Sequence, residues 1–305
     1  MIADFLTHRF TVNSAAYNTL SGYRTVITRT IKEVTGRELP DEHHLSSLLS
    51  QFAIERPRSH HTSPPWDLSI VLRALHFWPF EPLAKAELWA LTFKTVFLTA
   101  LATTKRRSEL HAFLHRVLHA ENWSHVTLIP DPVFVAKTER PGQPDTRLQE
   151  VTIKSLGAFV GPDLPVDANN CVVRAIKIYL ARSKDYRRGR KRLFISYKQS
   201  KLDEIKPATI SSWIVKTVRY AYEHASDETA ALHSVRAHDL RAMSASWGVF
   251  KNLRLQDILR AAQWRSHSTF TSFYLMDMSA LEEEMYKLGP LVAAQTVLPA
   301  SSSFN

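Results

Sequence analysis

The stretch from Leu83 to Leu101 is mostly apolar on every face of a helix, which limits the folds open to this chain. A helix of this kind is either enclosed by other elements of a large core or placed in a membrane. Lys85, Glu87 and Lys94 interrupt the stretch, and charges at this density disfavour a membrane span. We therefore expect a buried helix from Leu83 to about Ala102 and no membrane partner.

Between residues 125 and 156, short β-branched segments replace the helical pattern. They comprise residues 126–129, 133–135 and 150–153, separated by prolines and a glycine, as in small antiparallel sheets. Residues 194–197 form a further candidate strand. Helices are expected over 1–56, 68–75 with Asp67 as N-cap, 167–180, 207–224, 238–250, 254–262 and 279–288. The fold class is therefore mainly α with a small antiparallel β-sheet (α+β).

Residues 57–65 divide the chain. They contain three prolines and two serines and show no periodicity, so they predict a linker. The one cysteine, Cys171, lies in an apolar context and predicts a buried thiol in an intracellular protein. No Cys/His spacing predicts a metal site.

The formal net charge of +10 favours a polyanionic partner, of which nucleic acid is the commonest. A basic protein without such a partner has the same composition. Residues 182–192 hold seven Lys or Arg against one Asp, which fits either a solvated loop or a segment that faces phosphates. We favour the second interpretation.

Four short segments combine basic, histidine and aromatic side chains in a fixed order: Arg106–Leu110, Lys137–Thr138, Arg236–Arg241 and Trp264–Tyr274. Together they resemble the tyrosine recombinase (phage integrase) family. His238-Asp-Leu-Arg241 is similar to the family's His-x-x-Arg box, and Arg106-Arg-Ser-Glu-Leu to the context of its first arginine. Lys137 matches the family's hairpin lysine, Trp264 its His-or-Trp position and Tyr274 its tyrosine.

More narrowly, the sequence resembles the recombinases of DIRS- and Ngaro-type retrotransposons. The matching residues are Pro65–Leu68, Arg236–His238, Ser268–Phe270 and Phe273–Tyr274. The resemblance implies a tyrosine recombinase catalytic domain over 66–290, followed by a tail over 291–305. Residues 1–56, before the linker, would be a partial helical core-binding (SAM-like) DNA-binding region.

The resemblance implies DNA strand cleavage and rejoining through a 3′-phosphotyrosine, giving recombination or integration of a mobile element. Guanidinium groups stay charged and bind two phosphate oxygens at once, so Arg106 and Arg241 would form the clamp. His238 lies three residues before Arg241, on the same helix face, and would take the tyrosine proton. The remaining catalytic roles are the nucleophile Tyr274, the general acid Lys137 and the phosphate-binding indole of Trp264. Glu109 would orient its neighbours.

Four further residues are expected to contact DNA: Lys105, Arg107, Arg236 and Arg265. The expected partners are double-stranded DNA and a homo-tetramer whose protomers exchange a C-terminal helix, for which residues 279–292 are the candidate. We expect no cofactor and no metal, and a nuclear protein if the source is eukaryotic.

Several alternatives stay open on the sequence alone. Tyr274 could belong to an aromatic core stripe with Phe270 and Phe273, and Arg107 competes with Arg106 for the clamp. Lys154 is a rival of Lys137, and His267 a rival of Trp264. The chain as a whole could be a type IB topoisomerase-like enzyme, or a DNA-binding protein that keeps the fold without the activity.

Overall fold

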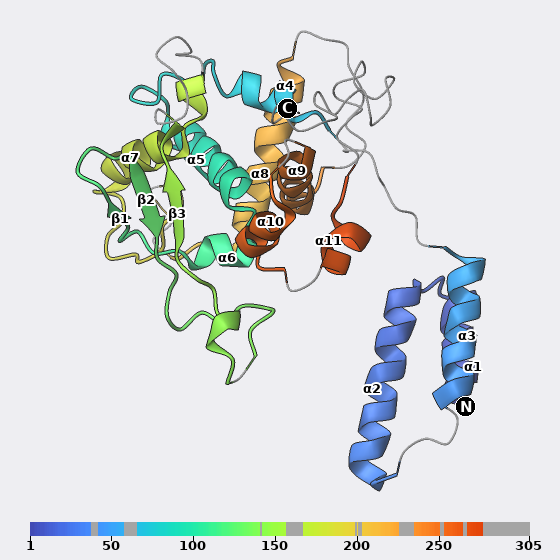
Figure 1. Ribbon diagram of the computed structural model, residues 1–305. Coiled ribbons are helices and arrows are strands. Elements are labelled where there is room, and N and C mark those ends of the chain that lie inside the picture. The colour runs from blue at the N-terminus through green and yellow to red at the C-terminus, as the bar shows by residue number, and fades with distance from the viewer. Residues whose placement is uncertain are drawn as a thin grey trace, which may run out of the picture. The chain divides into compact units, whose positions relative to one another are not determined.

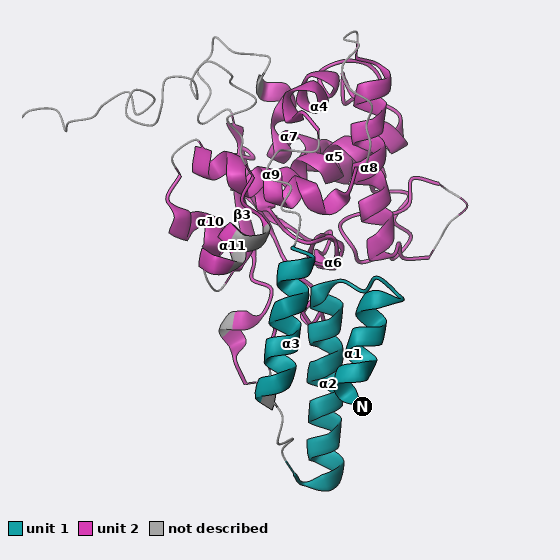
Figure 2. Ribbon diagram, turned by 90° about the vertical axis from the view of Figure 1, so that its right-hand side faces the viewer, with its two compact units in different colours: residues 1–60 teal, residues 61–305 magenta. Residues whose placement is uncertain are grey.

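The computed structural model describes residues 1–37, 42–57, 66–140, 142–156, 167–198, 200, 203–225, 235–250, 253–264 and 267–276. The chain divides into two compact units, residues 1–60 and 61–305 (Figure 2). Each unit has a hydrophobic core of its own. The division falls within the expected linker, of which residues 58–65 lie outside the described ranges, and the roles assigned to the domains stay predictions.

The first unit contains three helices: α1 (Ile2–Thr11), α2 (Tyr17–Thr35) and α3 (Glu42–Glu55). They enclose a small core in which the rings of Phe10 and Phe52 stack with their centroids 4.2 Å apart. Gly36 ends α2 in the left-handed region, at φ +66°, which glycine adopts without a side-chain clash. The helical pattern expected for this region is confirmed.

The second unit is built around α5 (Leu88–Thr103), most of whose side chains are buried. Three helices pack against it: α7 (Val172–Ser183), α8 (Pro207–Glu223) and α9 (Ala237–Phe250) (Figure 1). The predicted core helix is therefore present, but it begins at Leu88 and not at Leu83. Pro82 accepts turn hydrogen bonds from Lys85 and Ala86, and Glu87 is extended, so residues 83–87 form a turn before the helix.

Shorter helices complete this unit: α4 (Leu68–Ala74), α6 (Arg107–Ala112), α10 (Leu255–Ala262) and α11 (His267–Phe273). Asp67 caps α4 as expected, because its Oδ1 accepts a hydrogen bond from Ser69 N at 2.7 Å. The helix expected over 279–288 lies outside the described residues. No helix of the described ranges is long and apolar enough to cross a membrane.

A three-stranded antiparallel sheet lies beside α5 and α7. Its strands are β1 (Leu118–His119), β2 (His125–Leu128) and β3 (Val151–Lys154), in the order β1-β2-β3. In the register of the second pair, Val126 lies opposite Ile153. The predicted fold class, mainly α with a small antiparallel sheet, is confirmed.

Two expected strands are absent from their predicted places. Residues 133–135 form no strand; Asp131 accepts hydrogen bonds from Val133 N and Phe134 N and closes a turn there. Pro130 and Pro132 cannot donate to a ladder, and the Val133 side chain is exposed. Residues 194–197 also form no strand, although Phe194 and Ile195 are buried.

The interpretation of residues 182–192 as a phosphate-facing segment is wrong for several of its arginines. Arg187 is 7% exposed and donates to Ser183 Oγ and to the carbonyls of Arg192 and Leu193. Arg190 is equally buried and bonds to Tyr186 O. These guanidinium groups satisfy main-chain acceptors where α7 ends and the chain turns back.

A buried charge cluster ties the segment before α5 to its core. Lys94 Nζ is fully buried and donates to Glu81 Oε1 at 2.6 Å and to Leu75 O at 2.7 Å. Arg174 adds two hydrogen bonds to the same carboxylate, at 2.6 and 3.0 Å. Burial lowers the pKa of Lys94 to about 8, against the opposing effect of Glu81.

We predict that Glu81→Ala lowers the free energy of unfolding by about 3–5 kcal/mol, because it leaves a buried cation without its counter-ion. Replacing Lys94 by Met in the same variant should restore part of that loss, since the unpaired charge is then removed. Urea denaturation followed by tryptophan fluorescence measures both effects. A single variant as stable as the wild type would contradict the prediction.

Candidate active site

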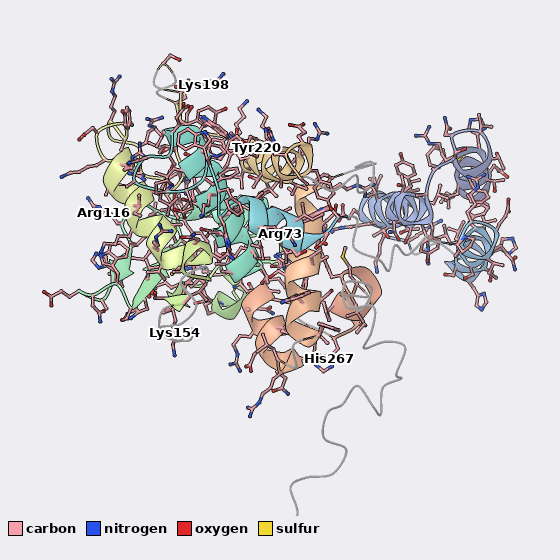
Figure 3. The ribbon with its side chains drawn as sticks, turned by 90° about the horizontal axis from the view of Figure 1, so that it is seen from above. Arg73, Arg116, Lys154, Lys198, Tyr220 and His267 are labelled. Carbon is pink, nitrogen blue, oxygen red and sulfur yellow. The ribbon has the colours of Figure 1, made fainter. Side chains whose placement is uncertain are left out.

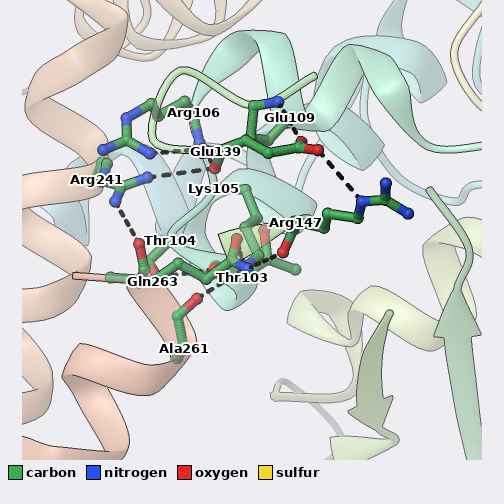
Figure 4. Close-up of polar contacts among 12 residues, drawn as sticks. Thr103, Thr104, Lys105, Arg106, Glu109, Glu139, Arg147, Arg241, Ala261 and Gln263 are labelled. Atoms are coloured by element: carbon green, nitrogen blue, oxygen red, sulfur yellow. Dashed lines mark hydrogen bonds and ion pairs between the residues drawn. The ribbon is translucent and has the colours of Figure 1, made fainter. Parts of the chain in front are cut away.

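The carboxylate of Glu109 joins two arginines that are far apart in the sequence (Figure 4). Its Oε1 accepts a hydrogen bond from Arg106 Nη1 at 2.6 Å, and its Oε2 lies 3.5 Å from Arg241 Nη1. Oε2 also accepts from Arg106 N at 2.8 Å, which caps α6 at its first turn. The Glu109 and Arg241 side chains are 1% and 2% exposed, so the ion pair between them is buried, whereas Arg106 is 17% exposed.

The end of α5 sets the direction of Arg106. Thr104 adopts φ +52°, in the left-handed region, and stops the helix by donating its N–H to Ala100 O. The chain then turns, and Lys105 points into the protein with 5% of its surface exposed. Its Nζ donates to Ala261 O at 3.0 Å and to Gln263 Oε1 at 3.1 Å. The ammonium group is therefore bonded within the protein, while Lys105 also forms part of the cavity wall described below; its contact with DNA stays a prediction.

Aromatic rings from α9, from α11 and from the residues that follow α10 and α11 gather around Arg241. The guanidinium carbon lies 4.8 Å from the ring centre of Trp264 and 5.8 Å from that of Tyr274. Trp264 and Tyr274 have their ring centroids 4.5 Å apart, and His238 meets Tyr274 edge to face at 5.1 Å. Phe270 packs beneath Trp264 at 5.2 Å. Tyr274 is therefore both part of an aromatic cluster and a neighbour of His238 and Arg241.

The main chain of Tyr274 is fixed to α9. Ser246 Oγ donates to Tyr274 O at 3.1 Å and accepts from Met276 N at 2.8 Å. Tyr274 N donates to Phe270 O at 2.8 Å, where α11 ends. Since α9 also carries His238 and Arg241, one helix positions the tyrosine and two of its neighbours.

A cavity of about 880 Å³ opens above this cluster, and His238 and Tyr274 are part of its wall. Its described lining contains six Lys or Arg and no Asp or Glu: Lys105, Arg106, Arg107, Lys137, Arg236 and Arg241. A cavity with this charge attracts anions, and guanidinium groups suit the oxygens of a phosphate. The site can therefore hold a phosphodiester beside a tyrosine hydroxyl.

These charges change the acid–base properties of the site. Removal of the His238 ring from water lowers its pKa, and Arg241, Arg106, Lys137 and Arg107 lower it further. The imidazole is therefore neutral at pH 7 and able to accept a proton. Burial, with Arg106 next, lowers the pKa of Arg241 to about 10, so that guanidinium stays charged at neutral pH.

Two N–H groups of the cluster are buried and have no hydrogen-bond partner within the described ranges. They belong to Nε of Arg241 and Nε1 of Trp264. Buried donors in proteins are nearly always paired, so both are candidate donors to a bound anion. Trp264 itself packs below the cavity wall, against Phe270 and Tyr274.

The structure brings together five of the predicted catalytic residues: Arg106, His238, Arg241, Trp264 and Tyr274. Lys137, Arg107 and Arg236 line the same cavity, and Arg265 lies outside the described residues. The catalytic and DNA-binding roles stay predictions.

Lys137 does not stand at the end of a strand, as we expected. It lies in a turn over 136–139, within the long connection between β2 and β3, because residues 133–135 form no strand. Its rival Lys154 projects from β3 into the solvent and borders a different cavity (Figure 3). His267, the rival of Trp264, is exposed at the start of α11.

Sequence reasoning missed Gln263, which contacts both Lys105 and the β2–β3 connection through its side chain. No periodicity or motif in the sequence marks this residue. Its position immediately before Trp264 was the one available signal.

We predict that the buried Lys105 makes the free energy of unfolding rise with pH between about 8 and 10.5. Burial lowers its pKa to about 8 from 10.5, with Glu109 opposing and Arg241 and Arg106 adding to the effect. Between these pH values the unfolded chain binds more protons than the folded one, so this contribution to the free energy of unfolding rises with pH. Below pH 8 it is constant.

The wild type should therefore gain up to about 3 kcal/mol relative to Lys105→Met as the pH rises through this window. Urea denaturation of both proteins at a series of pH values measures the difference. A difference that does not change with pH would show that Lys105 has an ordinary pKa.

No protein-family model and no curated protein sequence matches the chain significantly. Among solved structures, the chain is similar to the XerH site-specific recombinase bound to a palindromic difH substrate in a post-cleavage complex. The TM-score is 0.57 at 15% identity, over 93% of this chain and 70% of that one. The XerA recombinase matches with a TM-score of 0.47 at 13% identity, over 95% and 98%. The XerH likeness shows that this chain has the fold of the tyrosine site-specific recombinases.

Proposed function

We propose that this chain cleaves and rejoins DNA strands through a covalent 3′-phosphotyrosine on Tyr274, and so recombines or integrates DNA. The observation that carries the proposal is the meeting of Tyr274, His238 and the Arg106–Glu109–Arg241 cluster at one cationic cavity. The likeness to XerH supports it at the level of the fold.

In the proposed step, Tyr274 Oη forms a bond to phosphorus while the bond from phosphorus to the 5′ oxygen breaks. The phenolic proton passes to His238, and the departing 5′ oxygen takes a proton from Lys137. The reverse reaction, with a 5′ hydroxyl as nucleophile, rejoins a strand. The phosphotyrosine is itself a phosphodiester, so rejoining needs no nucleotide hydrolysis.

The charge of the cavity lowers the barrier to this step in two ways. Attack builds negative charge on the non-bridging oxygens, which Arg106 and Arg241 would stabilise. A tyrosine of ordinary pKa, about 10, is ionised to about one part in a thousand at pH 7, a cost of roughly 4 kcal/mol. The cations of the cavity keep His238 neutral, so its ring can take the proton as the attack proceeds.

The wider assignment rests on the sequence resemblance. It covers double-stranded DNA as the substrate, a homo-tetramer on two duplexes, and use by a mobile element of the DIRS or Ngaro type. It also includes a nuclear location if the source is eukaryotic. The formal net charge of +10 and the six cations of the cavity support a DNA partner.

We predict that the wild-type chain forms a covalent adduct with DNA and that Tyr274→Phe forms none. A library of nicked duplexes with randomised sequence contains the cleavage site whatever its bases are, and the nick traps the cleaved product. Denaturing gels and sequencing of the retained DNA measure the outcome. An adduct that persists in Tyr274→Phe would refute the role of Tyr274.

For the clamp, Arg241→Ala should slow adduct formation by at least about 100-fold, because a donor to the developing charge is lost. Its affinity in a gel-shift assay should change little, since contacts along the DNA remain. Thermal melting of the variant checks that it folds. A loss of binding as large as the loss of cleavage would contradict the assignment.

A third prediction separates recombination from a topoisomerase activity. A supercoiled plasmid with two copies of the selected sequence should yield exchanged products with the wild type and none with Tyr274→Phe. Restriction mapping detects the exchange. Relaxation of the plasmid that depends on Tyr274 but occurs without exchange would instead support a type IB topoisomerase-like enzyme. DNA binding with neither relaxation nor exchange would support a non-catalytic protein.

A further inference from the structure

Gln263 has an unusual main-chain conformation for its residue type. It follows α10 with φ +51° and ψ +44°, in the left-handed region where glycine is the usual residue. The next N–H, of Trp264, donates to Leu259 O at 2.9 Å and completes the end of the helix. Glycine would fulfil this main-chain role without a steric penalty, so the side chain of Gln263 calls for its own explanation.

That side chain connects two segments of the proposed site. Its Oε1 accepts a hydrogen bond from Lys105 Nζ at 3.1 Å, and Lys105 directly precedes Arg106. Its Nε2 donates to Arg147 O at 2.9 Å, in the connection between β2 and β3 (Figure 4). Both functional groups of the amide are therefore bonded, one to each segment.

From Arg147 the contacts continue to the turn that carries Lys137. Arg147 Nε lies 3.3 Å from Glu139 Oε1, and the other oxygen of Glu139 accepts a hydrogen bond from Ala136 N at 3.1 Å. Glu139 N also donates to Ala136 O at 2.9 Å. The Glu139 side chain is 14% exposed, so this turn is held by a largely buried carboxylate.

We propose that Gln263 is a positioning residue that places the Lys137 turn against the arginine cluster. The inference rests on the proposed function, because it assigns to Lys137 the proton of the leaving oxygen. Lys137 itself is exposed, and only its turn is anchored. Three segments must be correctly placed for this step: the α5–α6 junction, the end of α10 and the β2–β3 connection. The Gln263 amide joins all three.

The test uses Gln263→Gly, which keeps the left-handed main chain and removes both side-chain hydrogen bonds. The rate at which this variant forms the adduct is measured on two versions of the duplex whose sequence was recovered from the wild-type adduct. One has an ordinary 5′ oxygen at the cleaved bond, and the other has a 5′-bridging sulfur, which leaves as a thiolate without a proton. A misplaced Lys137 slows only the first reaction.

We expect Gln263→Gly to slow adduct formation by about 100-fold on the oxygen substrate, as for other small misplacements of reacting groups. On the sulfur substrate its rate should be close to that of the wild type. Glu139→Ala, at the other end of the contacts, should show the same pattern. Equal slowing on both substrates, or no slowing on either, would overturn the inference.

A control variant makes the outcome specific. Lys137→Ala should be slow on oxygen and restored by sulfur; if sulfur does not restore it, the acid role in the proposed function fails. Thermal melting of Gln263→Gly distinguishes misfolding, which would slow both substrates, from loss of position.

Discussion

The arrangement of the candidate site depends on one buried carboxylate, that of Glu109. Arg106 and Arg241 belong to helices far apart in the sequence. Their guanidinium groups repel each other, because both lie beside one carboxylate. Glu109 offsets the repulsion by bonding to both. Removing one partner of such a buried pair typically costs about 3–5 kcal/mol, because the remaining charge is left buried without a counter-ion. Two cations against one anion leave a net positive charge, which a phosphate can neutralise.

Local spacing was enough to predict part of this arrangement. Glu109 stands three residues after Arg106 at the start of a helix, where a side chain reaches back to the first N–H. His238 and Arg241 are likewise three residues apart and share a helix face. The contact between Glu109 and Arg241 joins segments 132 residues apart. No local pattern encodes it, and the family resemblance supplied the pairing of these segments.

Two of the sequence predictions, for residues 133–135 and for residues 182–192, failed for the same physical reason: main-chain hydrogen bonding outweighed the pattern of side chains. Val133 and Val135 suggested a strand, but the adjacent prolines and the Asp131 turn left them exposed. Charge counting suggested that residues 182–192 face phosphates. Carbonyl groups in the chain after α7 instead accept hydrogen bonds from Arg187 and Arg190, which are buried. A sequence shows how many cations a segment has, but the fold decides which of them have acceptors inside the protein.

The cations that do face the cavity explain why a histidine fits beside a tyrosine there. After burial, Arg241, Arg106, Lys137 and Arg107 lower the pKa of His238 and so keep the ring neutral at neutral pH. The same charges attract the phosphate that Tyr274 would attack. A carboxylate in the cavity wall would oppose both effects. Glu109 does not have this effect, because it is 1% exposed and its oxygens are bonded to Arg106 and Arg241. The two guanidinium groups, and not the carboxylate, therefore line the cavity.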